Sequence, residues 1–177
     1  MSSKRFWFIM LFPYIIAFCF IFMFTMPSIA PVLSASIGPE LLFTVPICAA
    51  LVSFTLSIVT LIQTIKGKYG AQELAKANKI VKLVHIPAYV IYFLFAIFSV
   101  LFLSIWGIGM VIVVILIDVF TIIYSGSIGL CAAIAAKKEN VLPSGSAVLY
   151  AIMSFIYCVD VFAAVIYNSK IKKTTLS

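Results

Sequence analysis

The sequence predicts an all-α membrane protein: a polytopic bundle of five transmembrane helices with one amphipathic helix at the membrane surface. Of its 177 residues, 65% are apolar and only 10% are charged. A water-soluble domain of this size cannot cover its surface with so few polar side chains. The apolar residues form long runs, and Lys and Arg fall between these runs, as they do in membrane loops. We therefore expect a single integral membrane domain over residues 1–177.

Composition also excludes several classes of protein. A net charge of +7 would suggest nucleic-acid binding in a soluble protein, but here it indicates membrane topology and attraction to the membrane surface. We therefore expect no nucleic-acid partner. Four cysteines lie inside apolar runs without metal-ligand spacing, which is typical of buried reduced thiols: Cys19, Cys48, Cys131 and Cys158.

The sequence contains no phosphate-binding loop, nucleophile elbow, metal-ligand cluster or dinucleotide fingerprint. An enzymatic function would need such a set of residues to carry its chemistry. We therefore expect a protein that is not an enzyme and that holds no cofactor and no metal.

Two spans are expected in the first part of the chain, at 6–26 and 41–65. The alternative for the first is a signal peptide, because Ser28-Ile29-Ala30 resembles a cleavage site. About twenty-one apolar residues exceed the usual core of a signal peptide, which favours a retained helix. Residues 27–40 contain three prolines and no basic residue, so we expect an outer loop there.

Residues 71–84 are too polar to span a membrane and alternate between a charged and an apolar face. Lys76, Lys79 and Lys82 recur every three residues, which predicts an amphipathic helix on the inner membrane surface. The solvated face of a connecting helix is the alternative. We expect His85, which follows directly, to lie at the same interface.

Three further spans are expected at 86–104, 110–136 and 147–167. With the N-terminus inside, nine of the twelve Lys and Arg become cytoplasmic: two before the first span, five after the second and two after the fourth. The positive-inside rule therefore favours a cytoplasmic N-terminus in the cell membrane. This topology leaves three lysines in an outer tail. If the tail is inside instead, one segment fails to cross or 86–136 crosses three times.

Three phrases resemble an uncharacterised family of small multi-span membrane proteins from Firmicutes-type bacteria. They are KLVHIPAY (82–89), IDVF leading to SGSIG (117–129), and FIYCVDVF (155–162). The resemblance covers roughly residues 79–173. It implies a bacterial membrane location, carries over no catalytic residue, and directs attention to His85, Asp118 and Asp160.

Asp118 and Asp160 are the only acids inside the expected spans. A charged Asp at the membrane centre costs about 2.5–3.5 kcal/mol and should face the bundle interior. At helical spacing Asp118 shares a face with Thr121 and Ser125, and Asp160 shares one with Tyr157. In the five-span topology both acids lie at one depth, so we expect them to meet and to share a proton.

These observations leave two functions open. The first is a non-enzymatic accessory or interaction protein, whose partners are the lipid bilayer and either a second copy or another membrane protein. The alternative is a small proton- or cation-coupled transporter that uses Asp118 and Asp160, supported by Thr121, Ser125 and Tyr157. We expect the first of these, because five spans in 177 residues make a small transporter unless the protein dimerises.

Overall fold

The computed structural model describes residues 4–29, 39–101 and 105–174. This part of the chain is all α-helical and has no strand, as predicted. Most of the predicted outer loop at 27–40, and the end of the predicted third span at 102–104, lie outside the described residues. The helices are α1 (Lys4–Ile29), α3 (Pro39–Ile65), α4 (Ala71–Leu101), α5 (Ile105–Lys138), α6 (Ser144–Met153) and α7 (Val159–Thr174).

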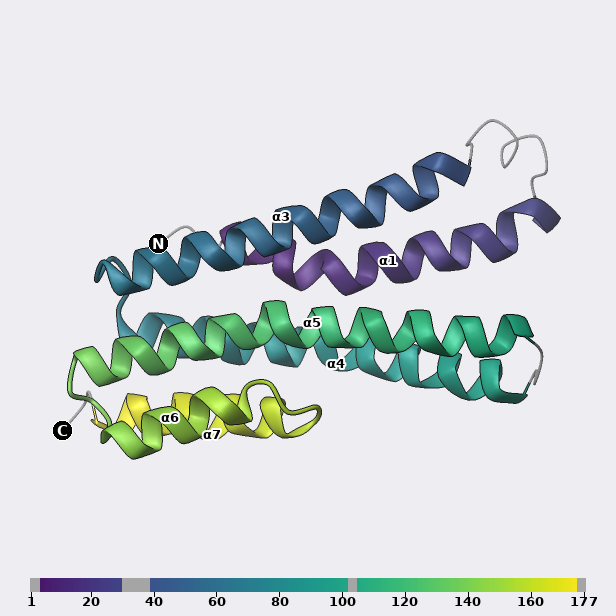
Figure 1. Ribbon diagram of the computed structural model, residues 1–177. Helices are drawn as coiled ribbons and strands as arrows, with labels where there is room; N and C mark the ends of the chain where they lie inside the picture. The colour runs from purple at the N-terminus through teal and green to yellow at the C-terminus, as the bar shows by residue number, and fades with distance from the viewer. Residues whose placement is uncertain (1–3, 30–38, 102–104, 175–177) are drawn as a thin grey trace.

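The helices pack side by side as three antiparallel hairpins (Figure 1). One hairpin is formed by α1 and α3 and a second by the longest helices, α4 and α5. The third, formed by α6 and α7, reaches only about halfway along the bundle before it turns back (Figure 1). The labelled N- and C-termini consequently lie at the same end of the molecule.

The prediction of five transmembrane helices is wrong. Three described segments are long and apolar enough to cross a membrane: Phe43–Ile65, Ala71–Leu101 and Ile108–Lys138. The predicted fifth span at 147–167 is instead divided between α6 and α7. The backbone of Cys158 has φ = 64°, a left-handed conformation that a continuing right-handed helix does not contain. The chain reverses here, between α6 and α7.

The predicted surface helix at 71–84 is also not a separate element, because it forms the first half of α4. A row of side chains at alternating spacings of three and four faces the bundle interior, and this spacing produces one continuous helix face. All of its members are buried: Ala71, Ala75, Asn78, Lys82, His85, Tyr89 and Tyr92. Lys82 and His85 therefore face the bundle interior and do not lie on an exposed face of the helix.

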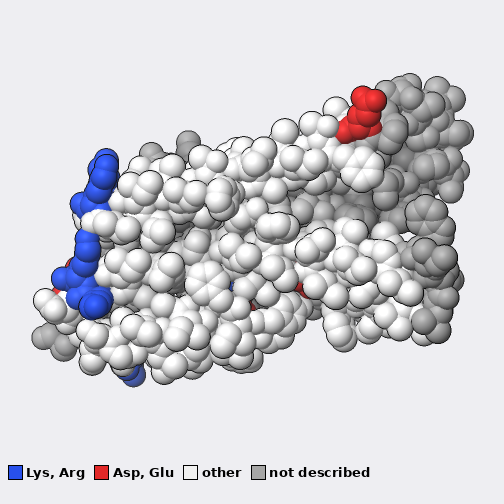
Figure 2. Space-filling model, in the orientation of Figure 1, with Lys and Arg blue, Asp and Glu red and all other residues white. Residues whose placement is uncertain are grey.

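Basic side chains gather at the end of the bundle where α3 and α5 finish and α4 begins (Figures 1 and 2). Two contacts hold this end together. The Lys138 ammonium donates to the carbonyl of Ile65, and the Glu139 carboxylate accepts from the backbone N–H of Ala71 at 3.0 Å. The sides of the bundle are apolar by contrast, with many large side chains exposed on α3, α4 and α5.

Candidate functional site

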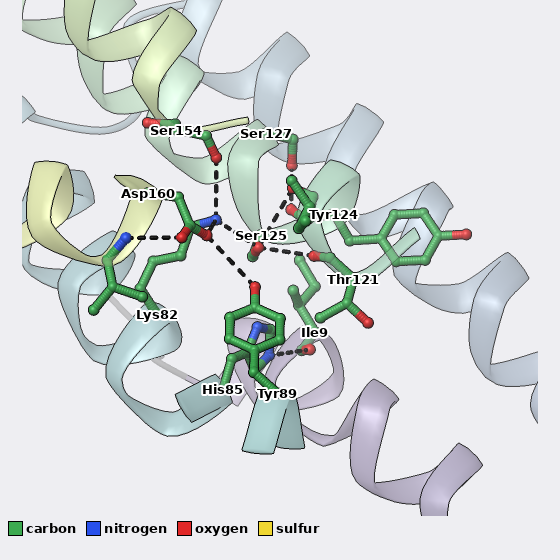
Figure 3. Close-up of polar contacts among 12 residues, drawn as sticks. Ile9, Lys82, His85, Tyr89, Thr121, Tyr124, Ser125, Ser127, Ser154 and Asp160 are labelled. Atoms are coloured by element: carbon green, nitrogen blue, oxygen red, sulfur yellow. Dashed lines mark hydrogen bonds and ion pairs between the residues drawn. The ribbon is translucent and has the colours of Figure 1, made fainter. Parts of the chain in front are cut away.

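A buried ion pair joins the middle of α4 to the start of α7 (Figure 3). The Lys82 Nζ lies 2.5 Å from Asp160 Oδ2, and neither side chain has any exposed surface. Charged groups leave water at a high free-energy cost, so a pair this deeply buried needs additional hydrogen bonds.

The ammonium of Lys82 has those hydrogen bonds. Besides Asp160, it donates to the Ser125 hydroxyl at 2.8 Å and to the backbone carbonyl of Ser154 at 3.1 Å. Three acceptors match the three donors of an ammonium group. On the other side, Asp160 Oδ1 accepts from the backbone N–H of Val161 at 2.9 Å. The pair therefore draws on α4, α5 and both arms of the α6–α7 hairpin.

The ion pair also accounts for the interruption between α6 and α7. The carbonyl end of a helix carries partial negative charge and the amide end partial positive charge. Lys82 contacts the carbonyl of Ser154, directly after α6, and Asp160 lies in the first turn of α7. Each charge thus stabilises the helix end that it complements.

Two glycines of α5 let the tip of the hairpin approach closely. A Cβ atom at Gly129 would lie 2.2 Å from the hydroxyl oxygen of Ser154, and one at Gly126 would lie 2.7 Å from the ring of Phe155. Contacts this short do not occur between real side chains. Small residues at these positions therefore permit the packing that brings the hairpin to Lys82.

Tyr89 connects the ion pair to the outside of the bundle. Its hydroxyl lies 3.5 Å from Asp160 Oδ2, and its ring centroid lies 5.1 Å from that of Tyr157. Both tyrosines line a groove of about 380 Å³, whose other walls are apolar: Ile86, Val90, Phe93, Cys158, Val161 and Phe162. Of the pair, Tyr157 is 40% exposed and Tyr89 is buried.

Asp118 lies near this groove but does not contact Asp160. It lies on α5 level with Tyr89 on α4, because the hydrogen bond between Lys82 and Ser125 sets the register of these antiparallel helices. Its buried Oδ1 has no hydrogen-bond partner in the described part of the chain. No hydrogen bond joins the two acids there, so the predicted contact with a shared proton is not formed. The reason is that Lys82 provides Asp160 with a full opposite charge.

The remaining predicted residues lie either in the site or away from it. Ser125 belongs to the site, and the buried Thr121 lies one turn away, where its carbonyl accepts from Ser125 at 2.8 Å. His85 is buried, with Nε2 3.1 Å from the carbonyl of Ile9 on α1. Lys76 is exposed and Lys79 partly exposed, away from the site.

Sequence reasoning named Lys82 only as an interfacial residue and did not name Tyr89 as a site residue, although a signal for both was present. Lysines spaced by three drift around a helix by about 60° at each step. From Lys76 to Lys82 that drift is about 120°, so Lys82 leaves the exposed face. It joins the three-four row of Asn78, His85 and Tyr89. In the described part of the chain, no group of three His, Cys, Asp or Glu residues is arranged to hold a metal ion.

The model of a family of unknown function, DUF6652, matches residues 7–173. The match agrees with the predicted resemblance to an uncharacterised family and extends it over the first two helices. No curated protein and no solved structure matches the chain.

Proposed function

This chain belongs to DUF6652, a family of unknown function, and we propose that it is an integral membrane protein with a proton- or cation-coupled transport site. The observation that carries this proposal is the fully buried pair of Lys82 and Asp160 at the tip of a hairpin that ends about halfway along the bundle. Ionisable residues within membrane segments are rare, and they mark ion and substrate pathways.

The membrane arrangement follows from the hairpins. We place α1, α3, α4 and α5 across the bilayer, while α6 and α7 enter and leave from one side. The 26 residues of α1 extend about 39 Å at 1.5 Å per residue, more than the roughly 30 Å hydrocarbon core. The basic end and both termini are then cytoplasmic, because basic loops stay inside.

A purely structural role does not require charges. Replacing a buried ion pair with well-packed apolar residues is often neutral or stabilising, so packing alone gives no reason to keep Lys82 and Asp160 here. Non-helical backbone at membrane depth is tolerated where protein buries it or where it lines a water-filled cavity. Transporters place their binding sites at such broken helices. At this hairpin tip the helical backbone is interrupted between α6 and α7, and the buried charges of Lys82 and Asp160 lie beside the interruption.

The charge balance indicates what the site would take up. Asp160 is neutralised by Lys82, whereas Asp118 has a buried oxygen that finds no hydrogen-bond partner among the described residues. When both acids are ionised, the three side chains carry one net negative charge. An apolar surrounding favours a neutral sum. One proton or one monovalent cation at Asp118 would supply it.

Infrared spectroscopy of the carboxyl stretch in lipid tests this proposal. We expect a carboxylic-acid band that titrates with pH and disappears in Asp118→Asn. The matched control is Glu40→Gln, which removes an exposed carboxyl group in the first turn of α3. This variant should leave the band intact. A band that stays protonated at every accessible pH would indicate a sealed structural contact and overturn the proposal.

Fewer observations support the interpretation as an accessory protein. Exposed apolar side chains cover α3, α4 and α5, but contact with lipid is sufficient to explain them without a protein partner. We therefore propose the bilayer as the partner of these surfaces and a non-enzymatic carrier as the function.

A further inference from the structure

The groove beside the ion pair opens on a surface that faces lipid in the proposed arrangement. Its rim is formed by exposed apolar side chains, among them Val90, Phe93 and Phe162. Among the described residues that line it, none is Lys, Arg, Asp or Glu. A ligand that reaches this groove from the bilayer must itself be largely apolar, because polar molecules partition poorly into hydrocarbon.

The inner wall of the groove differs from its rim. It carries the two tyrosine rings, Tyr89 and Tyr157, at a centroid separation of 5.1 Å and an interplanar angle of 58°. The faces of aromatic rings attract cations, and more strongly when water is excluded. The hydrogen bond between Lys82 and Ser125 sets the register of the antiparallel helices α4 and α5, and seven residues further along each helix Asp118 lies level with Tyr89. The carboxylate of Asp118 therefore places negative charge behind the same wall.

The cation of Lys82 does not cancel this charge. Its three donors are taken up by Asp160, Ser125 and the carbonyl of Ser154. The unpartnered oxygen of Asp118 is therefore the group that a positive ligand would neutralise. An anionic ligand would face Asp118 without a free cation to bind.

We propose that this groove binds a lipophilic organic cation, with the apolar body of the ligand between α4 and α7 and its charge against Tyr89 and Tyr157. This inference rests on the proposed function and names the substrate class of that site. Asp118 then binds either a proton or the charge of the organic cation. This competition couples the movement of protons to the movement of the organic cation.

The probe is tetraphenylphosphonium, measured by equilibrium dialysis with the purified full chain in lipid nanodiscs. We expect saturable binding to the wild type, and binding weaker by about tenfold or more in Asp118→Asn, which corresponds to about 1.4 kcal/mol. Tetraphenylborate has the same shape and the opposite charge, so it should show no saturable binding. Equal binding of both ions would overturn the inference.

Two pairs of variants locate the ligand. Val90→Trp fills the groove and should abolish binding. Val45→Trp fills a second apolar groove of about 370 Å³ between α1 and α3 and should leave binding unchanged. Tyr157→Leu should weaken binding, whereas Tyr157→Phe keeps the ring and should retain it. The tyrosine pair tests the groove even if a tryptophan variant fails to fold. Loss of binding in Val45→Trp alone would place the ligand elsewhere and overturn the inference.

The two proposals fail in different ways. If the infrared band titrates at Asp118 but tetraphenylphosphonium does not bind, the inference fails and the proposed function stands. If tetraphenylphosphonium binds and the band does not titrate, the groove is a binding site and the proton-coupled function fails.

Discussion

Lys82 and Asp160 are 78 positions apart in the sequence, yet their charged atoms lie 2.5 Å apart with both side chains fully buried. This contact fastens the tip of the α6–α7 hairpin to the middle of α4. It also places a complementary charge at the end of α6 and at the start of α7, the two helix ends at the hairpin tip. The architecture and the candidate site thus depend on the same pair.

Removing one member of the pair should destabilise the protein strongly. We expect Lys82→Met or Asp160→Asn to lower the free energy of unfolding by about 3–5 kcal/mol, because each leaves a buried charge without its partner. The double variant should lose less than the sum of the two. Reversible unfolding in mixed detergent measures these values. Lys76→Met, on the exposed face of the same helix, is the control and should change stability by less than about 0.5 kcal/mol.

The glycines under the hairpin tip should not tolerate a methyl group. Gly129→Ala places a Cβ 2.2 Å from the hydroxyl oxygen of Ser154, so we expect a loss of about 1–3 kcal/mol from overpacking. Gly109→Ala, on the same helix with nothing within 4 Å, should be neutral or stabilising. Ser154→Gly combined with Gly129→Ala should restore part of the loss. Equal effects at both glycines would contradict the close contact.

The turn at Cys158 should prefer glycine. Its φ of 64° is unfavourable for residues with a Cβ, by roughly 1–2 kcal/mol. We expect Cys158→Gly to stabilise the protein and Cys158→Val to destabilise it. Cys48 is also exposed but lies inside α3, where Cys48→Gly should be destabilising by up to about 1 kcal/mol. Thermal unfolding of the three variants would measure these changes in stability. A loss of stability in Cys158→Gly, as in Cys48→Gly, would contradict the left-handed turn.

The end of α7 and the connection between α3 and α4 should be reached from the same side of the membrane. In a chain whose native cysteines are replaced by alanine, we expect Lys173→Cys and Lys68→Cys to react with an impermeant thiol reagent from the same side. Glu40→Cys should react from the other side, because α3 separates it from Lys68. Labelling of Lys173→Cys together with Glu40→Cys would mean that 147–167 crosses after all.

The sequence determined the class of this protein because that class depends on composition. Apolar runs separated by lysines require helices in a bilayer, and such helices are present in α3, α4 and α5. The three lysines of the C-terminal tail already conflicted with five spans. The hairpin of α6 and α7 is compatible with the alternative that one segment fails to cross.

The tertiary structure alone decided where the fifth segment breaks and which charges meet. No Pro or Gly marks residues 147–167, and the local sequence is compatible with one continuous helix. The break depends on partners that lie far away in the chain: Lys82 on α4 and the glycines of α5. Such contacts are set by the packing of three hairpins, which local periodicity does not encode. The sequence could therefore identify Asp160 as a buried acid, while its lysine partner became apparent only in the folded chain.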